Sequence, residues 1–368
     1  MKVILSGGGT GGHIYPALAI GTLLKERYPE TKILYVGTAN GLEASIVPKE
    51  GIDFATVTVE GLPRRLSPKG VKVLLKLLKG SWQSRQILRK FCPDIIVATG
   101  GYVCGPISYL AARQGVKLVL HEQNALPGLT NRLLSKKADL ICTTFKESIQ
   151  YFPQAKNVVL TGLPIRQQII ETSRDAGARA LGIDPEKFII LVTGGSRGAK
   201  RLNDAMLEVI KYFTNKTHFH IIHITGNAGY EDFIRELKNH GIDHEAIGNI
   251  TIKPYLHGMH YALACANVVV GRAGATFISE ITAKGIPAIL IPYPYAAENH
   301  QHANAMSLVR NGAALIIKDD QLTGQKLLST LKELLKNNDK LQEMKTKSKM
   351  LGKPDAGEKI VNLIESLL

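Results

Sequence analysis

Cysteine and long apolar runs are scarce in this sequence of 368 residues. No two of the four cysteines, Cys92, Cys104, Cys142 and Cys265, have the spacing of a zinc-binding or redox pair. Four cysteines in this length do not make a disulfide framework either, which favours a reduced compartment. The chain contains no run of about 18 uninterrupted apolar residues and opens directly on a strand-like segment, so we expect neither a membrane-spanning helix nor a signal peptide.

Acidic residues are outnumbered by basic ones. The 46 Lys and Arg against 31 Asp and Glu give a formal net charge of +15. Such a balance favours a nucleic acid, an anionic membrane or a phosphorylated substrate as partner, and a solvated basic surface is the alternative. Zinc-finger spacing, a helix-turn-helix pattern and basic strands with aromatic residues are all missing, so we expect no nucleic acid.

Short aliphatic segments that end at glycine or polar turns alternate with helical patterns along the chain. KVILSG, KILYVG and DIIVATGG are examples in the first half, and the pattern restarts at FIILVTGG. This alternation predicts α/β domains, each a doubly wound parallel sheet with helices on both faces. The turn at Leu163–Pro164 is the expected hinge, so we predict one domain at 1–163 and a second at 164–352.

The glycine run Gly7–Gly12 follows the first predicted strand. It matches the G-x-G-x-x-G pattern of dinucleotide sites, but the second strand ends in Gly37–Thr38, where such a site needs an acid for the ribose. A phosphate-binding P-loop needs Lys followed by Ser or Thr after the last glycine, and this chain has His13 there. A nicotinamide dehydrogenase and a nucleotide hydrolase are therefore both disfavoured.

What remains of the motif is an anion site with a histidine beside it. Backbone N–H groups in a glycine turn at a helix N-terminus attract negative charge, and Pro16 suits a first helical turn. His13 has the chemistry of a base or of a hydroxyl ligand. The alternative is that His13 only caps the turn.

Several longer blocks resemble the MurG family of bacterial transferases. They include GGGTGGHIYPALAI, HEQNALPGLTNR, TGGSRGAKRLN and GRAGATFISEITAKGIPAILIPYPYAAENHQHANA, in family order from Lys2 to about residue 315. The resemblance implies a GT-B glycosyltransferase, two Rossmann-like domains facing a cleft, with residues of about 353–368 packing back on the first domain.

The resemblance also implies an activity. The enzyme would transfer N-acetylglucosamine from UDP-N-acetylglucosamine, with inversion, to the 4-hydroxyl of N-acetylmuramic acid in lipid I, making lipid II for peptidoglycan. It would work as a peripheral protein at the cytoplasmic face of the bacterial membrane. The alternative is another GT-B enzyme, a lipid glycosyltransferase with a different acceptor or a UDP-sugar epimerase.

The metal-binding Asp-x-Asp motif of many glycosyltransferases is absent, and the only close aspartate pair is Asp319–Asp320. The diphosphate would then rest on glycine loops, helix N-termini and basic side chains. We expect no metal ligands and no required cofactor, and stimulation by a divalent cation is left open.

The resemblance assigns substrate contacts residue by residue. Those of the first domain and the linker are sugar and diphosphate contacts at Thr10, Gly11 and Gly12, a donor-sugar contact at Asn124, and a nucleotide contact at Arg166.

In the second domain Ser196 would hold phosphate, Leu256 would meet uracil through its backbone, and Gln301 would bind sugar hydroxyls with Asn304 nearby. Glu280 would accept hydrogen bonds from the ribose hydroxyls. It is the last residue of the substrate-binding start of a helix, whose other residues are Ala275, Thr276, Phe277, Ile278 and Ser279. His300 stands where family members often have glutamine, which leaves its role open.

Three residues are candidates for catalysis. His13 is the expected base, with Glu122 and Tyr102 as second choices. The alternative for Glu122 is a structural role, in which the buried carboxylate organises its own turn. The alternative for Tyr102 is that its ring only packs against a loop.

The segment 68–90 is expected to form a basic amphipathic helix. Such a helix, with the chain's one tryptophan, can lie in a membrane interface, and the alternative is packing on the sheet with solvated lysines. The residues expected at the anionic leaflet are Val71, Leu74, Leu75, Leu78, Trp82, Lys72, Lys76 and Lys79.

Overall fold

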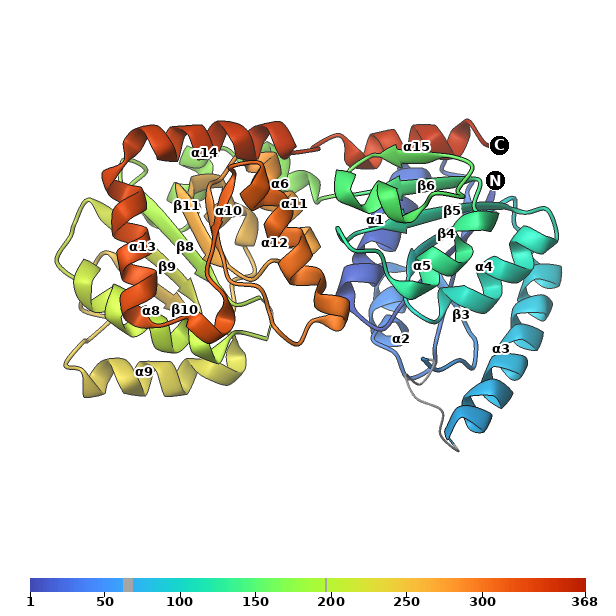
Figure 1. Cartoon of the computed structure of the whole chain (residues 1–368), viewed down its shortest axis with the longest axis horizontal. Coiled ribbons are helices and arrows are strands. Elements are labelled where there is room, and N and C mark those ends of the chain that lie inside the picture. Colours follow the sequence, from blue (N-terminus) through green and yellow to red (C-terminus); the bar gives the residue numbers. More distant parts are fainter. Residues whose placement is uncertain (62–68, 196) are drawn as a thin grey trace. The chain divides into compact units, whose positions relative to one another are not determined.

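The computed structural model describes residues 1–61, 69–195 and 197–368, and of residues 69–72 the backbone only. The chain divides into two compact units (Figure 1). The first comprises Met1–Ile165 together with Pro354–Leu368, and the second comprises Arg166–Lys353. The sequence placed these boundaries slightly earlier, after residues 163 and 352.

A seven-stranded parallel sheet in the order β3-β2-β1-β4-β5-β6-β7 forms the first unit. Its central strands are near-continuous aliphatic runs because both faces are covered. The strands are β1 (Lys2–Gly7), β2 (Lys32–Gly37), β3 (Asp53–Thr56), β4 (Ile95–Gly100), β5 (Lys117–Glu122), β6 (Leu140–Thr143) and β7 (Val158–Leu160).

Alternate side chains of β1 build the two cores of this unit. Val3 and Leu5 pack with apolar residues of α1 and α15, while Ile4 packs with those of α3 and α4. The helices are α1 (Gly11–Arg27), α2 (Glu43–Ile46), α3 (Lys69–Phe91), α4 (Cys104–Arg113), α5 (Leu129–Leu134) and α15 (Ala356–Glu365).

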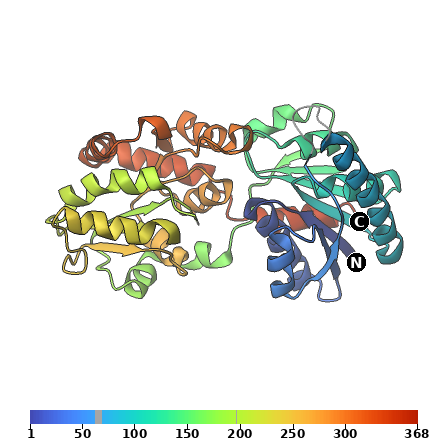
Figure 2. The ribbon, with the colours of Figure 1, turned by 90° about the horizontal axis from the view of Figure 1, so that it is seen from below.

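The last helix of the chain, α15, belongs to the first unit. Figure 2 shows it in red beside the blue α1. Arg27 of α1 forms ion pairs with Glu358 and with Glu365, the latter at 2.7 Å, and Lys359 donates to the Leu160 carbonyl at 2.9 Å. The segment expected to pack on the first domain therefore lies there.

The second unit is a six-stranded parallel sheet in the order β10-β9-β8-β11-β12-β13. Its strands are β8 (Phe188–Thr193), β9 (Phe219–Ile224), β10 (Ile250–Lys253), β11 (Val268–Gly271), β12 (Ala288–Leu290) and β13 (Ala314–Ile316). Its helices are α6 (Gln167–Glu171), α7 (Arg174–Ala180), α8 (Lys200–Phe213), α9 (Tyr230–Asn239), α10 (Met259–Cys265), α11 (Ala275–Lys284), α12 (His300–Arg310), α13 (Gly324–Lys336) and α14 (Asn338–Leu351).

Each sheet has one point where the strand order reverses. In the first unit it lies between β1 and β4, and in the second between β8 and β11. Ligands of doubly wound folds bind outside the carboxyl ends of the strands at such a point. Both glycine-rich motifs follow these strands, Gly8–Gly12 after β1 and Gly194–Gly198 after β8.

Buried histidines predict a loss of stability in acid. Burial lowers the pKa of His121 to about 4 and that of His223 to about 3. Because the unfolded chain binds these protons first, stability is lost as pH falls from about 6.5 towards those values. Replacing His223 by leucine should reduce the drop in unfolding free energy between pH 7.5 and pH 5 by about 2 kcal/mol in urea titrations.

The exposed His240 supplies the control for this experiment. His240→Gln should leave the pH dependence of the wild type unchanged. An equal drop in His223→Leu and in the wild type would show that His223 titrates normally in the folded state.

Candidate functional site

The glycine turn of the first unit touches the turn that follows β4. A Cβ at Gly101 would lie 2.4 Å from the Gly8 carbonyl oxygen, so no side chain fits between them. Gly101 also has a φ of 85°, and Gly9 one of 82°, which favours glycine at both positions. This close approach brings the helix that carries His13 next to the turn that carries Tyr102.

His13 is half-buried in the first turn of α1. Its Nδ1 lies 2.9 Å from the Gly8 carbonyl oxygen and 3.4 Å from Thr10 Oγ1. A carbonyl only accepts, so in the neutral ring Nδ1 carries the proton and Nε2 the lone pair. A Cβ at Gly100 would come within 3.1 Å of Nε2, so glycine there leaves room for the ring.

Glu122 ends β5 and is buried. Its Oε1 accepts from the Asn124 N–H at 2.9 Å and its Oε2 from Asn131 Nδ2 at 2.8 Å and the Gly128 N–H at 3.2 Å. Burial raises its pKa to about 7, against these hydrogen bonds, which lower it. Both oxygens hold the loop that presents Asn124, which favours the alternative that Glu122 organises its own turn.

The other predicted residues of the first unit surround the start of α1. Thr10 and Gly12 are exposed, and Gly11 is half-buried. Tyr102 is 41% exposed, and its ring faces the position of Gly9. Exposure leaves Tyr102 accessible to a ligand, so its role stays a prediction.

In the second unit most of the predicted donor residues follow the carboxyl ends of four strands of the sheet, β8, β10, β11 and β12. Leu256 follows β10 and is half-buried, and the helix α11 begins after β11 at Ala275. Ser196 follows β8 and lies outside the described residues. Two positions further along the chain, Gly198 has a φ of 74° and lies against the Thr225 carbonyl, a contact that excludes a side chain.

Two residues that are predicted to bind the nucleotide contact each other. Arg166 Nη2 donates to Glu280 Oε1 at 3.1 Å, and burial raises the pKa of Glu280 while Arg166 lowers it. Arg166 is half exposed, so it can reach a ligand, whereas Glu280 is buried. An anionic ligand bound at Arg166 would therefore compete with the Glu280 carboxylate.

The predicted contact residues at the helix start of α11 differ in their burial. Thr276, Phe277 and Ser279 are half-buried and remain accessible. Ile278 is buried, its N–H donates to the Gly274 carbonyl, and its carbonyl accepts from Thr282 Oγ1. The Ile278 side chain is therefore enclosed by the unit, and its role as a substrate contact stays a prediction.

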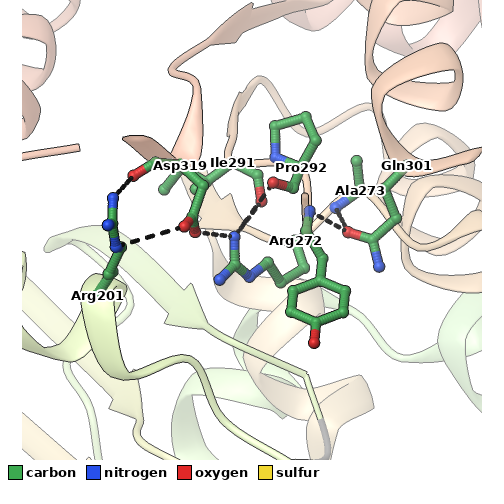
Figure 3. Close-up of polar contacts among 8 residues, drawn as sticks. Arg201, Arg272, Ala273, Ile291, Pro292, Gln301 and Asp319 are labelled. Atoms are coloured by element: carbon green, nitrogen blue, oxygen red, sulfur yellow. Dashed lines mark hydrogen bonds and ion pairs between the residues drawn. The ribbon is translucent and has the colours of Figure 1, made fainter. Parts of the chain in front are cut away.

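Gln301 joins two loops of the second unit. Its Oε1 accepts from the Ala273 N–H at 3.2 Å and the Tyr293 N–H at 2.9 Å (Figure 3). Asn304 is buried, and its Nδ2 donates to the Ala273 carbonyl at 3.2 Å, so it supports this loop. His300 is the first residue of α12 and is half-buried.

Family models match both units. The N-terminal domain of glycosyltransferase family 28 matches residues 3–143, and its C-terminal domain matches residues 189–360. The chain is a family 28 glycosyltransferase. Its two Rossmann-like parallel sheets are those of the GT-B fold.

Full-length relatives narrow the family. A protein of Desulforamulus reducens is 50% identical over all of this chain and 99% of its own. A protein of Moorella thermoacetica is 46% identical over 99% of this chain and 98% of its own. Both are named UDP-N-acetylglucosamine--N-acetylmuramyl-(pentapeptide) pyrophosphoryl-undecaprenol N-acetylglucosamine transferase. The crystal structure of Acinetobacter baumannii MurG matches at 29% identity and a TM-score of 0.80, covering 99% of both chains. The glycosyltransferase belongs to the MurG family.

The helix α3 of this glycosyltransferase packs by a different face from the one that carries the residues expected at the anionic leaflet. Val73, Gly80, Ser84 and Leu88 are buried, whereas the predicted residues are exposed. The helix therefore packs on the unit with solvated lysines, as the alternative expected, but the described apolar residues of the predicted face do not take part in that packing. Those exposed are Leu74, Leu75, Leu78, Trp82, Lys76 and Lys79, and the side chains of Val71 and Lys72 are outside the description.

Two features are absent from the part of the chain that the structure describes. None of the helices in that part is long and apolar enough to cross a membrane. No group of three or more His, Cys, Asp or Glu among its residues is arranged to hold a metal ion.

Sequence reasoning missed one cluster in the second unit. Arg272, Asp319 and Arg201 form a charged group beside the Gln301 loops (Figure 3). The one signal in the sequence was the aspartate pair at 319–320.

Glu122→Ala tests the turn that the carboxylate organises. The substitution leaves buried N–H donors without an acceptor, so the unfolding free energy should fall by about 3 kcal/mol in urea titrations. Glu26→Ala, at an exposed position of α1, is the control and should cost less than about 0.5 kcal/mol. Equal costs for the two variants would contradict the assignment.

Proposed function

We propose that this glycosyltransferase transfers N-acetylglucosamine from UDP-N-acetylglucosamine to the 4-hydroxyl of N-acetylmuramic acid in lipid I, making lipid II. The observation that carries the proposal is the 50% identity, over the whole chain, to a relative named for this reaction. The geometry of His13 agrees with it, because the reaction needs a group that accepts the hydroxyl proton.

His13 is the proposed general base. The acceptor oxygen forms a bond to C1 of the donor sugar on the face opposite UDP, and its proton passes to Nε2 of His13. The bond between C1 and the β-phosphate oxygen breaks, and UDP leaves with the electron pair. The Gly8 carbonyl at 2.9 Å stabilises the protonated ring by accepting from Nδ1.

The second unit is proposed to hold the donor. Arg166 and the phosphate-facing glycine loop with Ser196 would bind the diphosphate, and the N-terminus of α11 would add its dipole. Glu280 would accept from the ribose hydroxyls, Leu256 would meet uracil, and Gln301 the sugar. In the first unit Thr10, Gly11, Gly12 and Asn124 would contact the substrates, with Tyr102 near the acceptor.

We propose that no resident metal is needed, because cationic and N–H groups can neutralise the leaving diphosphate. Stimulation by a divalent cation is an outcome of the same assay. The transfer of radiolabel from UDP-N-acetylglucosamine to a short-chain lipid I analogue is measured with and without a chelator. Label that stays in the nucleotide despite donor binding would indicate another acceptor.

His13→Ala tests the base. The rate of label transfer should fall by about 10²–10⁴-fold, the range for removal of a general base, while donor binding persists. His240→Ala is the control, because His240 is exposed on the second unit. Near-normal turnover of His13→Ala would remove the histidine from the mechanism.

We also propose that α3 contacts the anionic cytoplasmic leaflet, where a lipid-linked acceptor is confined. Leu75, Leu78 and Trp82 are each 61% exposed, and the exposed Lys76 and Lys79 lie beside them. Apolar side chains flanked by lysines and a tryptophan suit a membrane interface. This would make the protein a peripheral one at that face.

A triple charge reversal tests this contact. Replacing Lys72, Lys76 and Lys79 by glutamate should reduce binding to anionic vesicles at low salt by about 100-fold or more, since each basic residue near the surface contributes about 1 kcal/mol. The control reverses Lys345, Lys347 and Lys349, which are exposed on α14 and give the same net charge. An equal loss of vesicle binding in both variants would show that net charge alone causes the effect and would contradict a specific contact by α3.

A further inference from the structure

Asp319 carries a carboxylate enclosed by two arginines. Arg272 Nη1 donates to Asp319 Oδ1 at 2.6 Å, and Arg201 Nε lies 3.6 Å from Oδ2 (Figure 3). Arg201 also donates to the Asp319 carbonyl at 2.8 Å. Only 12% of the Arg272 side chain and 11% of the Asp319 side chain are exposed. Removing one partner of such a buried ion pair destabilises the fold strongly, because the other charge remains buried without compensation.

Arg272 connects the loop after β11 with the loop after β12. Its Nη1 also donates to the Ile291 carbonyl at 3.1 Å and the Pro292 carbonyl at 3.3 Å. The guanidinium lies 5.5 Å from the centre of the Tyr293 ring. Asp319, which follows β13, thus fixes an arginine that holds two neighbouring loops together.

These two loops supply the hydrogen bonds that hold Gln301. Ala273 directly follows Arg272, and Tyr293 directly follows Pro292. The N–H groups of both converge on Gln301 Oε1. The amide nitrogen points away from them (Figure 3), so its direction depends on the spacing that Arg272 sets between the two loops.

We propose that Asp319 is a positioning residue for recognition of the donor sugar. It holds Arg272, Arg272 holds the two loops, and the loops aim the amide of Gln301 at the sugar hydroxyls. Asp319 itself touches no substrate. The inference rests on the proposed function, since it takes UDP-N-acetylglucosamine as the donor.

Asp319→Asn tests this role, because it keeps the side-chain shape and removes the charge. Affinity for UDP-N-acetylglucosamine should fall about tenfold, the equivalent of a hydrogen bond or two, while affinity for UDP stays within about twofold. Both are measured by calorimetry on the full chain. Gln301→Ala should give the same pattern, and the double variant should lose no more than either single one.

Asp320→Asn is the matched control. Asp320 is the exposed neighbour, and its replacement changes the net charge equally, so both affinities should match the wild type. Asp319→Glu retains the carboxylate and should recover part of the loss. Arg272→Lys keeps the positive charge but loses the fork that reaches several oxygens, so it should reproduce the pattern if Asp319→Asn fails to fold.

The possible outcomes separate the inference from the function it rests on. Equal losses for UDP and for UDP-N-acetylglucosamine would assign Asp319 to stability alone. Additive losses in the double variant would show that Asp319 does not act through Gln301. A wild type that binds UDP but not UDP-N-acetylglucosamine would overturn the proposed donor, and with it this inference.

Discussion

The reversal of strand order in each parallel sheet is the constraint on which the sites depend. At such a point the chains leave two neighbouring strands towards opposite faces of the sheet, so a crevice opens above the loops that follow them. In the first unit these loops touch at Gly8 and Gly101, where a Cβ would collide with backbone. The glycines therefore permit this contact, which places the start of α1, with His13, beside the turn that carries Tyr102.

Carboxylates that are fully or largely buried hold segments near the carboxyl edges of the two sheets, each with a different set of donors. Glu122 is held by N–H groups of its own loop, Glu280 by one partly exposed arginine, and Asp319 by two arginines. A buried carboxylate is costly unless its oxygens are satisfied, so each one orders the groups around it. The Glu280 pair differs from the other two because its arginine reaches solvent and can exchange the carboxylate for a ligand.

Local patterns predicted the strands, the glycine turns and the helix starts, because each depends on residues adjacent in the chain. The roles of individual side chains were harder to predict from the sequence. Ile278 lies within a matching motif, yet its side chain faces the core, and only the packing of α11 shows this. Arg272 and Asp319 are 47 positions apart and meet only because β11 and β13 end at the same edge of one sheet. No pattern in a single sequence marks such a pair.

The helix α3 shows why periodicity alone could not choose between packing and exposure. Its buried face includes Gly80 and Ser84, and a Cβ at Gly80 would lie 2.6 Å from the Thr58 carbonyl oxygen. Small residues let the helix approach the unit closely, so its larger apolar side chains are not required for that contact. Those side chains, Leu74, Leu75, Leu78 and Trp82, instead face outward among lysines. Exposed apolar surface gathered on one helix face is typical of a surface that contacts a partner or a membrane, and the lysines favour an anionic one.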